Sequence, residues 1–247
     1  MNKAIIVAVT SLILVRCGWF LANKAVSNRK IRIGVYALFF CITLACAITV
    51  RNIQADFPDA KLMAAILKFC ASAPSLLLAL RGFLMEKNRF DLRIVIALAL
   101  CLMADVIINF SLVAGGSVFA IAHMIFTITF IIENKPDRKQ KLAWLILTLV
   151  IAVILVLIYS HINNIPMYLF ALAYLSIMIS TVVFSVKLNK LIFVSAIIFA
   201  LSDCFLIFNM TVKPTVLMKL AALLIYYISL HLYGIAVWEI SYPHEKI

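Results

Sequence analysis

Two aspartates lie inside apolar stretches of this sequence, where a carboxylate is costly. Asp105 occurs in ALALCLMADVIINF and Asp203 in FVSAIIFALSDCFLIF. An ionisable side chain at bilayer depth faces the interior of a helix bundle, finds partners there and marks a candidate functional site. Two carboxyl groups in a low-dielectric site can divide the roles of proton donor and carboxylate. The pair therefore predicts acid–base chemistry or the handling of protons or cations.

Further ionisable residues lie in apolar stretches and extend the candidate site: Lys68, His123, Lys219 and His231. Lys68 shares one helical face with Ser72 and Ser75, at i, i+4 and i+7 spacing. Two i, i+4 pairs, Asp105 with Asn109 and His123 with Thr127, add weaker support. We expect structural or interfacial roles for Lys219 and His231. Simple ties between helices are the competing explanation for all of these groups.

The composition identifies the surroundings of these residues. Of 247 residues, 66% are hydrophobic and 13% are charged, whereas a soluble domain is about half apolar and a quarter charged. The net charge of +12 does not predict nucleic-acid binding, because the basic residues form short clusters between apolar runs. The six cysteines include no CxxC pair. A cytosolic enzyme, a disordered tail and a secreted disulfide scaffold are excluded, and a polytopic membrane protein is predicted.

Nine apolar stretches approach the length of roughly 20 residues that crosses a bilayer as a helix. They are 4–22, 33–50, 62–80, 92–111, 117–132, 141–160, 166–186, 191–209 and 216–238. The connections are too short for a soluble domain, so any chemistry lies within the membrane. The predicted fold class is all-α, a polytopic transmembrane helix bundle. The first stretch follows MNK like a signal peptide, but Arg16-Cys17 breaks a cleavage pattern, so we expect a retained helix.

Basic residues lie mainly on one side of the predicted bundle. They fall within 24–32, 81–93, 135–141 and 187–190, with Lys246 in the tail. The opposite side has only Lys3, Arg51, Lys61 and Lys213. The positive-inside rule therefore places the N-terminus outside and the C-terminus in the cytoplasm. We expect a bacterial cytoplasmic membrane, with an internal eukaryotic membrane as the alternative.

The topology places several polar groups at a similar depth. Asp105 and Asp203 are expected slightly beyond the midplane, on the outer side, from their distance to the inner ends of their segments. Lys68 and His123 are both expected seventh from the outer ends of their segments. The tandem tyrosines 226–227 lie near the middle of the last segment. An intramembrane site would require such a common level.

Two motifs surround the aspartates. Ala104-Asp105 is followed by Gly115, Phe119 and His123, which are four residues apart from one another. The later pair Ser202-Asp203 is followed by Asn209, six residues after the aspartate.

Together with Lys68 and the tandem pair Tyr226-Tyr227, these motifs resemble the YhhN family of lysoplasmalogenase-like membrane proteins, over about residues 62–240. The glycine usual before the first aspartate is Ala104 here, and the glutamine expected after the tyrosines is Leu230. The resemblance implies eight core helices within 33–247, which leaves 1–32 as an additional N-terminal helix and loop.

The resemblance also implies an activity, the hydrolysis of the vinyl ether bond of a lysoplasmalogen to a fatty aldehyde and a glycerophospho-alcohol. Catalysis would fall to Asp105 and Asp203. Substrate binding would fall to Lys68, His123, Asn209, Tyr226 and Tyr227. Protonating a vinyl ether requires an acid that keeps its proton near neutral pH, and a carboxylate that stabilises the cation or activates water. We expect no metal ion and no cofactor.

Three other functions remain open. A transporter would use the aspartates for protons or cations, although few Gly or Pro residues break the predicted helices. A lipid-binding or scaffold protein would not need the carboxylates at all. A zinc hydrolase would use His123, His231 and the aspartates, but no two of these have ligand spacing on one helix. The expected partners are a lysophospholipid and the bilayer, with no nucleic acid; the oligomeric state is not predicted.

Overall fold

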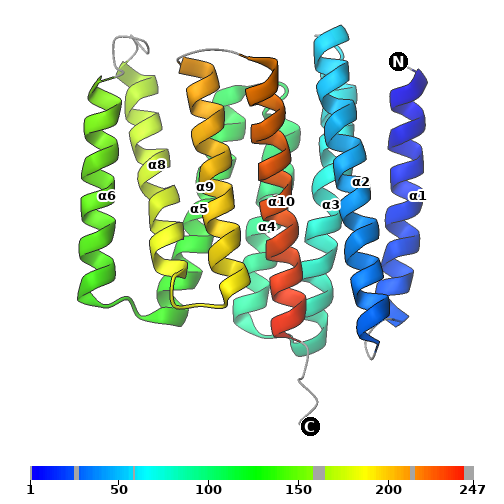
Figure 1. The fold of residues 1–247 in the computed structure, drawn as a ribbon, viewed down its shortest axis with the longest axis horizontal. Helices are drawn as coiled ribbons and strands as arrows, with labels where there is room; N and C mark the ends of the chain where they lie inside the picture. The colour runs from blue at the N-terminus through cyan, green and yellow to red at the C-terminus, as the bar shows by residue number, and fades with distance from the viewer. Residues whose placement is uncertain (1, 25–27, 58, 158–164, 212–214, 242–247) are drawn as a thin grey trace.

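The computed structural model describes residues 2–24, 28–57, 59–157, 165–211 and 215–241. These residues form nine α-helices and no strand, which confirms the predicted all-α class (Figure 1). The helices are α1 (Asn2–Lys24), α2 (Arg29–Asp56), α3 (Lys61–Glu86), α4 (Arg89–Ile107), α5 (Leu112–Asn134), α6 (Arg138–Leu157), α8 (Ile165–Ser185), α9 (Lys190–Thr211) and α10 (Val216–Ile240).

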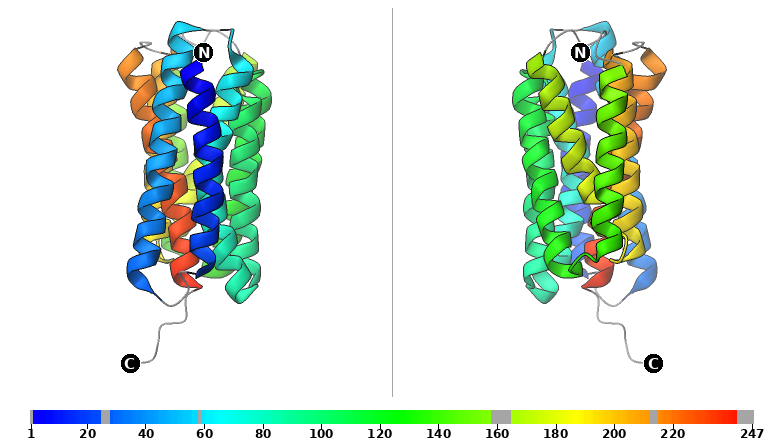
Figure 2. Two further views of the ribbon diagram at one scale, coloured as in Figure 1. Left: turned by 90° about the vertical axis from the view of Figure 1, so that its right-hand side faces the viewer. Right: turned by 90° about the vertical axis from the view of Figure 1, so that its left-hand side faces the viewer.

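The helices run side by side along one common direction and alternate in polarity. In Figure 1, α6 and α1 lie at the left and right sides of the bundle, with the other helices between them. The side views of Figure 2 show that the bundle is narrower in the perpendicular direction. The first residues of α1 and the last residues of α10 lie at opposite ends of the helices. The described basic clusters consequently share one end, which we call the inner end. Lys213 and Lys246, both used in the charge bias, lie outside the described residues.

Seven of the described helices are long and apolar enough to cross a membrane, which fits a multi-pass integral membrane protein. Helices α4 and α6 are not among them. Every 18-residue stretch of α4 includes the charged residues Asp91, Arg93 and Asp105. Helix α6 ends at Leu157, and residues 158–160 of its predicted segment fall outside the described part of the chain.

Helices α3 and α10 pack backbone to backbone along the centre of the bundle. A Cβ atom at Gly234 would lie 2.5 Å from the Ser75 carbonyl oxygen, and one at Gly82 would lie 2.8 Å from the Val237 carbonyl oxygen. Small residues permit such close approach between membrane helices. This contact fixes the positions of the α3 and α10 side chains that reach the candidate site.

Polar contacts join α10 to α2 and α4 at the inner end. Tyr36 donates a 2.6 Å hydrogen bond to Glu239, and the Arg32 Nε atom lies 3.5 Å from the same Oε1 atom. Ser241, directly after α10, donates a 2.5 Å hydrogen bond to the fully buried Asp91 of α4. These contacts secure the end of α10 that is opposite to the candidate site.

The helix ends differ from the predicted segments around residue 110. The prediction ended one helix at residue 111 and began the next at 117, but α4 ends at Ile107 and α5 begins at Leu112. Asn109 donates hydrogen bonds to the carbonyl oxygens of Asp105 and Val106, at 2.7 and 3.1 Å. Ser111 caps α5 by accepting from the Ala114 amide. Asn109 thus belongs to the connection, and the expectation that it extends a helical face with Asp105 is wrong.

Candidate active site

A cavity of about 450 Å³ opens among seven helices in the half of the bundle opposite the basic clusters. Both predicted catalytic residues line it, Asp105 from α4 and Asp203 from α9. The cavity is also lined by three of the predicted substrate-binding residues, Lys68, Asn209 and Tyr226. Apolar side chains of α5, α8, α9 and α10 supply most of the remaining wall. The structure therefore brings five of the seven predicted site residues to one cavity.

Asp105 is buried in the last turn of α4, where α3 and α10 both contact it. Its Oδ2 atom accepts hydrogen bonds from Ser72 of α3 and from the Tyr226 hydroxyl of α10, the latter at 2.8 Å. Lys68, one turn before Ser72, interacts electrostatically with the same carboxylate. Two donors and a nearby cation favour the ionised form of a carboxyl group.

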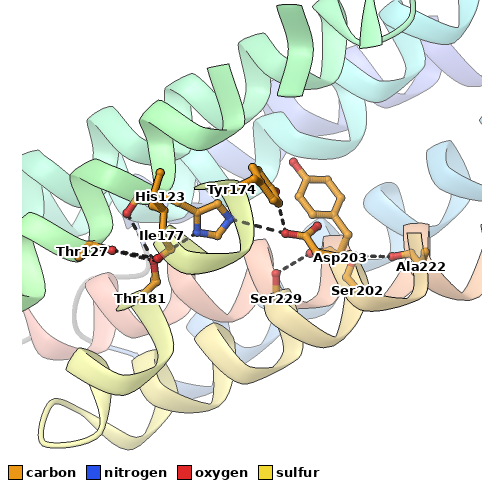
Figure 3. Close-up of polar contacts among 10 residues, drawn as sticks. His123, Thr127, Tyr174, Ile177, Thr181, Ser202, Asp203, Ala222 and Ser229 are labelled. Carbon is orange, nitrogen blue, oxygen red and sulfur yellow. Dashed lines mark hydrogen bonds and ion pairs between the residues drawn. The ribbon is translucent and has the colours of Figure 1, made fainter. Parts of the chain in front are cut away.

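Asp203 is buried near the middle of α9 and has different partners. Its Oδ2 atom accepts a 2.7 Å hydrogen bond from the Tyr174 hydroxyl of α8 (Figure 3). The preceding Ser202 donates a 2.9 Å hydrogen bond to the Ala222 carbonyl of α10, which ties α9 to α10 at this level. Within the described residues, the only basic group in contact with this carboxylate is His123. Asp203 therefore has fewer stabilising contacts for a negative charge than Asp105.

His123 lies behind Asp203 and does not line the cavity. Its Nε2 atom is 3.8 Å from Asp203 Oδ2, beyond hydrogen-bond distance, and its Nδ1 atom is 3.4 Å from Thr181 Oγ1 (Figure 3). Because α5 begins at Leu112, His123 is at mid-helix and not seventh from the outer end of its segment as expected. Its substrate-binding role remains a prediction, and the observed neighbour is a catalytic candidate.

Aromatic rings connect the neighbours of the two aspartates. The Tyr226 ring packs edge-on against Phe119 at 5.7 Å and Phe199 at 5.2 Å, and Phe199 also contacts the His123 ring at 4.4 Å. Tyr227 packs against Tyr226 at 4.9 Å and does not line the cavity. Its predicted contact with substrate remains untested by this geometry. Tyr226, which contacts Asp105, and His123, which lies next to Asp203, therefore both pack against Phe199.

Asn209 joins the end of α9 to the start of α10 at the cavity. Its Oδ1 atom accepts a 2.7 Å hydrogen bond from the Thr215 amide, and Thr215 caps α10. The Asn209 side chain is 1% exposed, and among the described residues its Nδ2 atom has no hydrogen-bond partner. An unsatisfied buried amide that lines a cavity is available to a polar ligand.

The sequence did not identify Tyr174, whose hydroxyl contacts Asp203. The two residues are 29 positions apart on different helices, so only the packing of α8 against α9 relates them. Ser72 was singled out by its spacing from Lys68, and the structure shows that it serves Asp105. Arg51 and Gln54 of α2 also line the cavity, although Arg51 was expected in an outer connection, after the segment 33–50.

His231 lies away from the cavity, on the α10 face that packs against α2. Its Nε2 atom is 3.1 Å from the Tyr36 carbonyl oxygen, and its ring lies 5.5 Å from that of Phe40. In the described ranges, no group of three or more His, Cys, Asp or Glu residues is arranged to hold a metal ion. The residues proposed for a zinc site are thus divided between two parts of the bundle.

The tyrosine hydroxyls that contact the aspartates are expected to matter for turnover. Tyr174→Phe and Tyr226→Phe each remove one hydrogen bond to a buried carboxylate, which is worth about 1.5–3 kcal/mol. Each should lower kcat about tenfold or more with little change in KM, measured on purified protein. Tyr233→Phe is the matched control, because the Tyr233 ring is buried against Phe126 and its hydroxyl has no hydrogen-bond partner among the described residues. Equal losses in all three variants would show that the hydroxyls act only through stability.

Comparisons with known proteins identify the family. Neither the curated proteins nor the solved structures include a match to this chain. The sequence model of the YhhN family matches residues 73–233, a range that contains both aspartates, Asn209 and the tandem tyrosines. Because this match covers well over half of the chain and the cavity is built largely from it, the protein belongs to the YhhN family.

Proposed function

We propose that this protein is a membrane hydrolase that cleaves the vinyl ether bond of lysoplasmalogens. The observation that carries the proposal is the pair Asp105 and Asp203, two buried carboxyl groups with different partners at one mainly apolar cavity. Membership of the YhhN family, which is associated with hydrolase activity, supports the same reaction class. A carboxylic acid and a carboxylate in one mainly apolar site are the groups that this hydrolysis needs.

The contacts favour separate roles for the two aspartates. Asp203, with one hydroxyl donor and no nearby lysine among the described residues, protonates the β-carbon of the vinyl ether and creates an oxocarbenium ion. Asp105, next to Lys68 and held by two hydroxyls, stabilises that cation and takes a proton from the attacking water. The resulting hemiacetal divides into the fatty aldehyde and the glycerophospho-alcohol. The proton on Asp105 returns to Asp203 before the next turnover, so the net reaction consumes one water.

The cavity wall suits a single-chain amphiphile. Leu112 and Val113 of α5, Leu206 of α9 and Leu223 of α10 line it, so an alkenyl chain can replace water there. The polar groups are fewer than the apolar ones and lie on α2, α3, α4, α8, α9 and α10. We propose that the chain lies against the apolar wall while the vinyl ether carbon reaches the aspartates.

The test is to incubate purified protein with a lysoplasmalogen and, separately, with a lysophospholipid of the same head group that carries an ester-linked chain. The expected result is free aldehyde from the vinyl ether substrate, and neither aldehyde nor fatty acid from the ester. Absence of aldehyde from the vinyl ether substrate, with folded protein, would overturn the proposal. Accumulation of intact lipid or of a cation in proteoliposomes, without cleavage, would favour the transporter instead.

We also propose that the cavity opens toward the outer leaflet. The basic clusters of the described loops lie at the opposite end of the bundle, and positive charge marks the cytoplasmic side. A bacterial cytoplasmic membrane remains the proposed location. An N-terminal tag that is accessible only after permeabilisation would contradict this orientation.

A further inference from the structure

Three cationic side chains from three helices line the same cavity as the aspartates. Arg51 lies near the outer end of α2, Lys68 in the second turn of α3 and Lys219 in the first turn of α10. These residues lie in the second half of α2 and the first halves of α3 and α10, which are at the end of the bundle opposite to the basic clusters (Figure 1). In a protein whose positive charge is concentrated at the inner end, a convergence of cations at the outer end needs its own explanation.

The structure gives these cations little internal compensation. Within the described residues, none of the three makes an ion pair within 4.0 Å. Lys68 interacts electrostatically with Asp105. The Arg51 Nε atom is buried and, in the same ranges, has no hydrogen-bond partner. The buried Asn209 Nδ2 atom, at the same cavity, is also unpaired there. Buried donors without acceptors are costly, so they indicate a ligand that supplies acceptors.

We propose that Arg51 and Lys219, with the Asn209 amide, form a subsite for the phosphate of a phospholipid head group. This inference rests on the proposed function and deepens it, because it names what holds the polar end of the substrate. Arginine and lysine bind phosphate oxygens through charge-assisted hydrogen bonds. The planar guanidinium of arginine can donate two parallel hydrogen bonds to one phosphate group. Arg51 precedes the part of the chain that matches the family, residues 73–233, so α2 contributes to the site from outside that match.

The subsite explains how one cavity serves both ends of an amphiphile. The phosphate lies at the outer end, between α2 and the start of α10, while the apolar wall receives the chain. Tyr226, which holds Asp105, is seven residues after Lys219 on α10, about 10 Å deeper along the helix at 1.5 Å per residue. Phosphate binding at Arg51 and Lys219 therefore positions a lipid so that its glycerol spans the distance to the carboxylates and its vinyl ether bond reaches them.

The test measures binding and does not depend on cleavage. The probes are a saturated 1-O-alkyl lysophosphatidylcholine, which has no vinyl ether to hydrolyse, and the corresponding 1-O-alkylglycerol, which has no phosphate. In detergent, Arg51→Ala and Lys219→Ala should each weaken binding of the lysophospholipid about tenfold or more, as expected for the loss of a charged hydrogen bond. Binding of the alkylglycerol should change less than about twofold. Arg51→Lys should recover part of the loss.

Lys61→Ala is the matched control, since Lys61 is an exposed cation at the same end of the bundle that does not line the cavity. It should leave the affinity for both probes unchanged. An equal loss of affinity for both probes in the Arg51 and Lys219 variants would overturn the subsite, as would unchanged affinity for the lysophospholipid. Displacement of the lipid by inorganic phosphate at the same concentration would overturn the assignment of the subsite to a lipid head group. Because neither probe contains a vinyl ether, these binding results could be interpreted even if the hydrolase proposal failed.

Discussion

Asp203→Asn and Asp105→Asn should each reduce aldehyde release from a lysoplasmalogen by about 10²–10⁴-fold, the contribution typical of general acid–base groups. The amide has the size of the carboxyl group, so the hydrogen bonds from Tyr174 and Tyr226 keep an oxygen acceptor. The amide cannot donate its proton to carbon as Asp203 does, nor carry the negative charge that Asp105 offers the cation. The measurement is kcat on purified variants with KM determined in parallel.

Asp137→Asn is the control for this pair. Asp137 lies in the connection between α5 and α6, where Lys187 donates a 2.7 Å hydrogen bond to it, and the ion pair is exposed. Hydrogen bonding from that lysine holds the pKa of Asp137 below its usual range, so this carboxyl group is ionised. Asp137→Asn therefore removes a negative charge that lies outside the cavity. Turnover should remain at the wild-type level. If either buried aspartate variant kept wild-type turnover, that aspartate would have no catalytic role.

The second large effect is expected at the contact between α3 and α10. Gly234→Ala places a Cβ atom 2.5 Å from the Ser75 carbonyl oxygen and 3.0 Å from Leu78 Cβ. Backbone atoms cannot rotate away, so the helices must separate, at a cost of about 1–3 kcal/mol or more. Separation also moves Ser72 relative to Tyr226, the two residues that hold Asp105. We expect a lower midpoint of thermal unfolding in detergent together with reduced turnover.

Gly34→Ala provides the comparison on α2. A Cβ atom at Gly34 meets nothing within 4 Å, and alanine favours a helix by roughly 1 kcal/mol over glycine. This variant should unfold at the wild-type temperature or slightly above it. A Gly234 variant as stable as the Gly34 variant would show that α3 and α10 do not need their close contact.

The helices were predictable because apolar length alone marks a membrane span, but their ends were not. Helix α5 begins five residues before its predicted segment, because Ser111 caps it in a stretch where apolar and small residues continue on both sides. Helix α4 ends early because the Asn109 side chain donates hydrogen bonds to two carbonyl oxygens of its last turn. Such side-chain-to-backbone contacts depend on local competition that a hydrophobic pattern does not record.

Some residues of the candidate site could likewise be predicted from the sequence, and others could not. Residues that are unusual where they stand, such as Asp105, Asp203 and Lys68, could be found from sequence because an ionisable group in an apolar helix is rare. Tyr174 could not be found in this way, since a tyrosine in a membrane helix is ordinary. Its role depends on the contact of its hydroxyl with Asp203 of α9. Arg51 and Lys219 had an ordinary explanation near helix ends, and only the shared cavity relates them to the aspartates.

The most direct measurement is mass spectrometry of the aldehyde that purified protein releases from a lysoplasmalogen in D₂O, with rapid trapping of the product. Protonation of the β-carbon by an acid in exchange with solvent predicts one deuterium on the carbon next to the carbonyl. The same assay should give labelled aldehyde about 10²–10⁴-fold more slowly with Asp105→Asn or Asp203→Asn. Labelled aldehyde at the wild-type rate from both variants, or none from the wild type, would contradict the account.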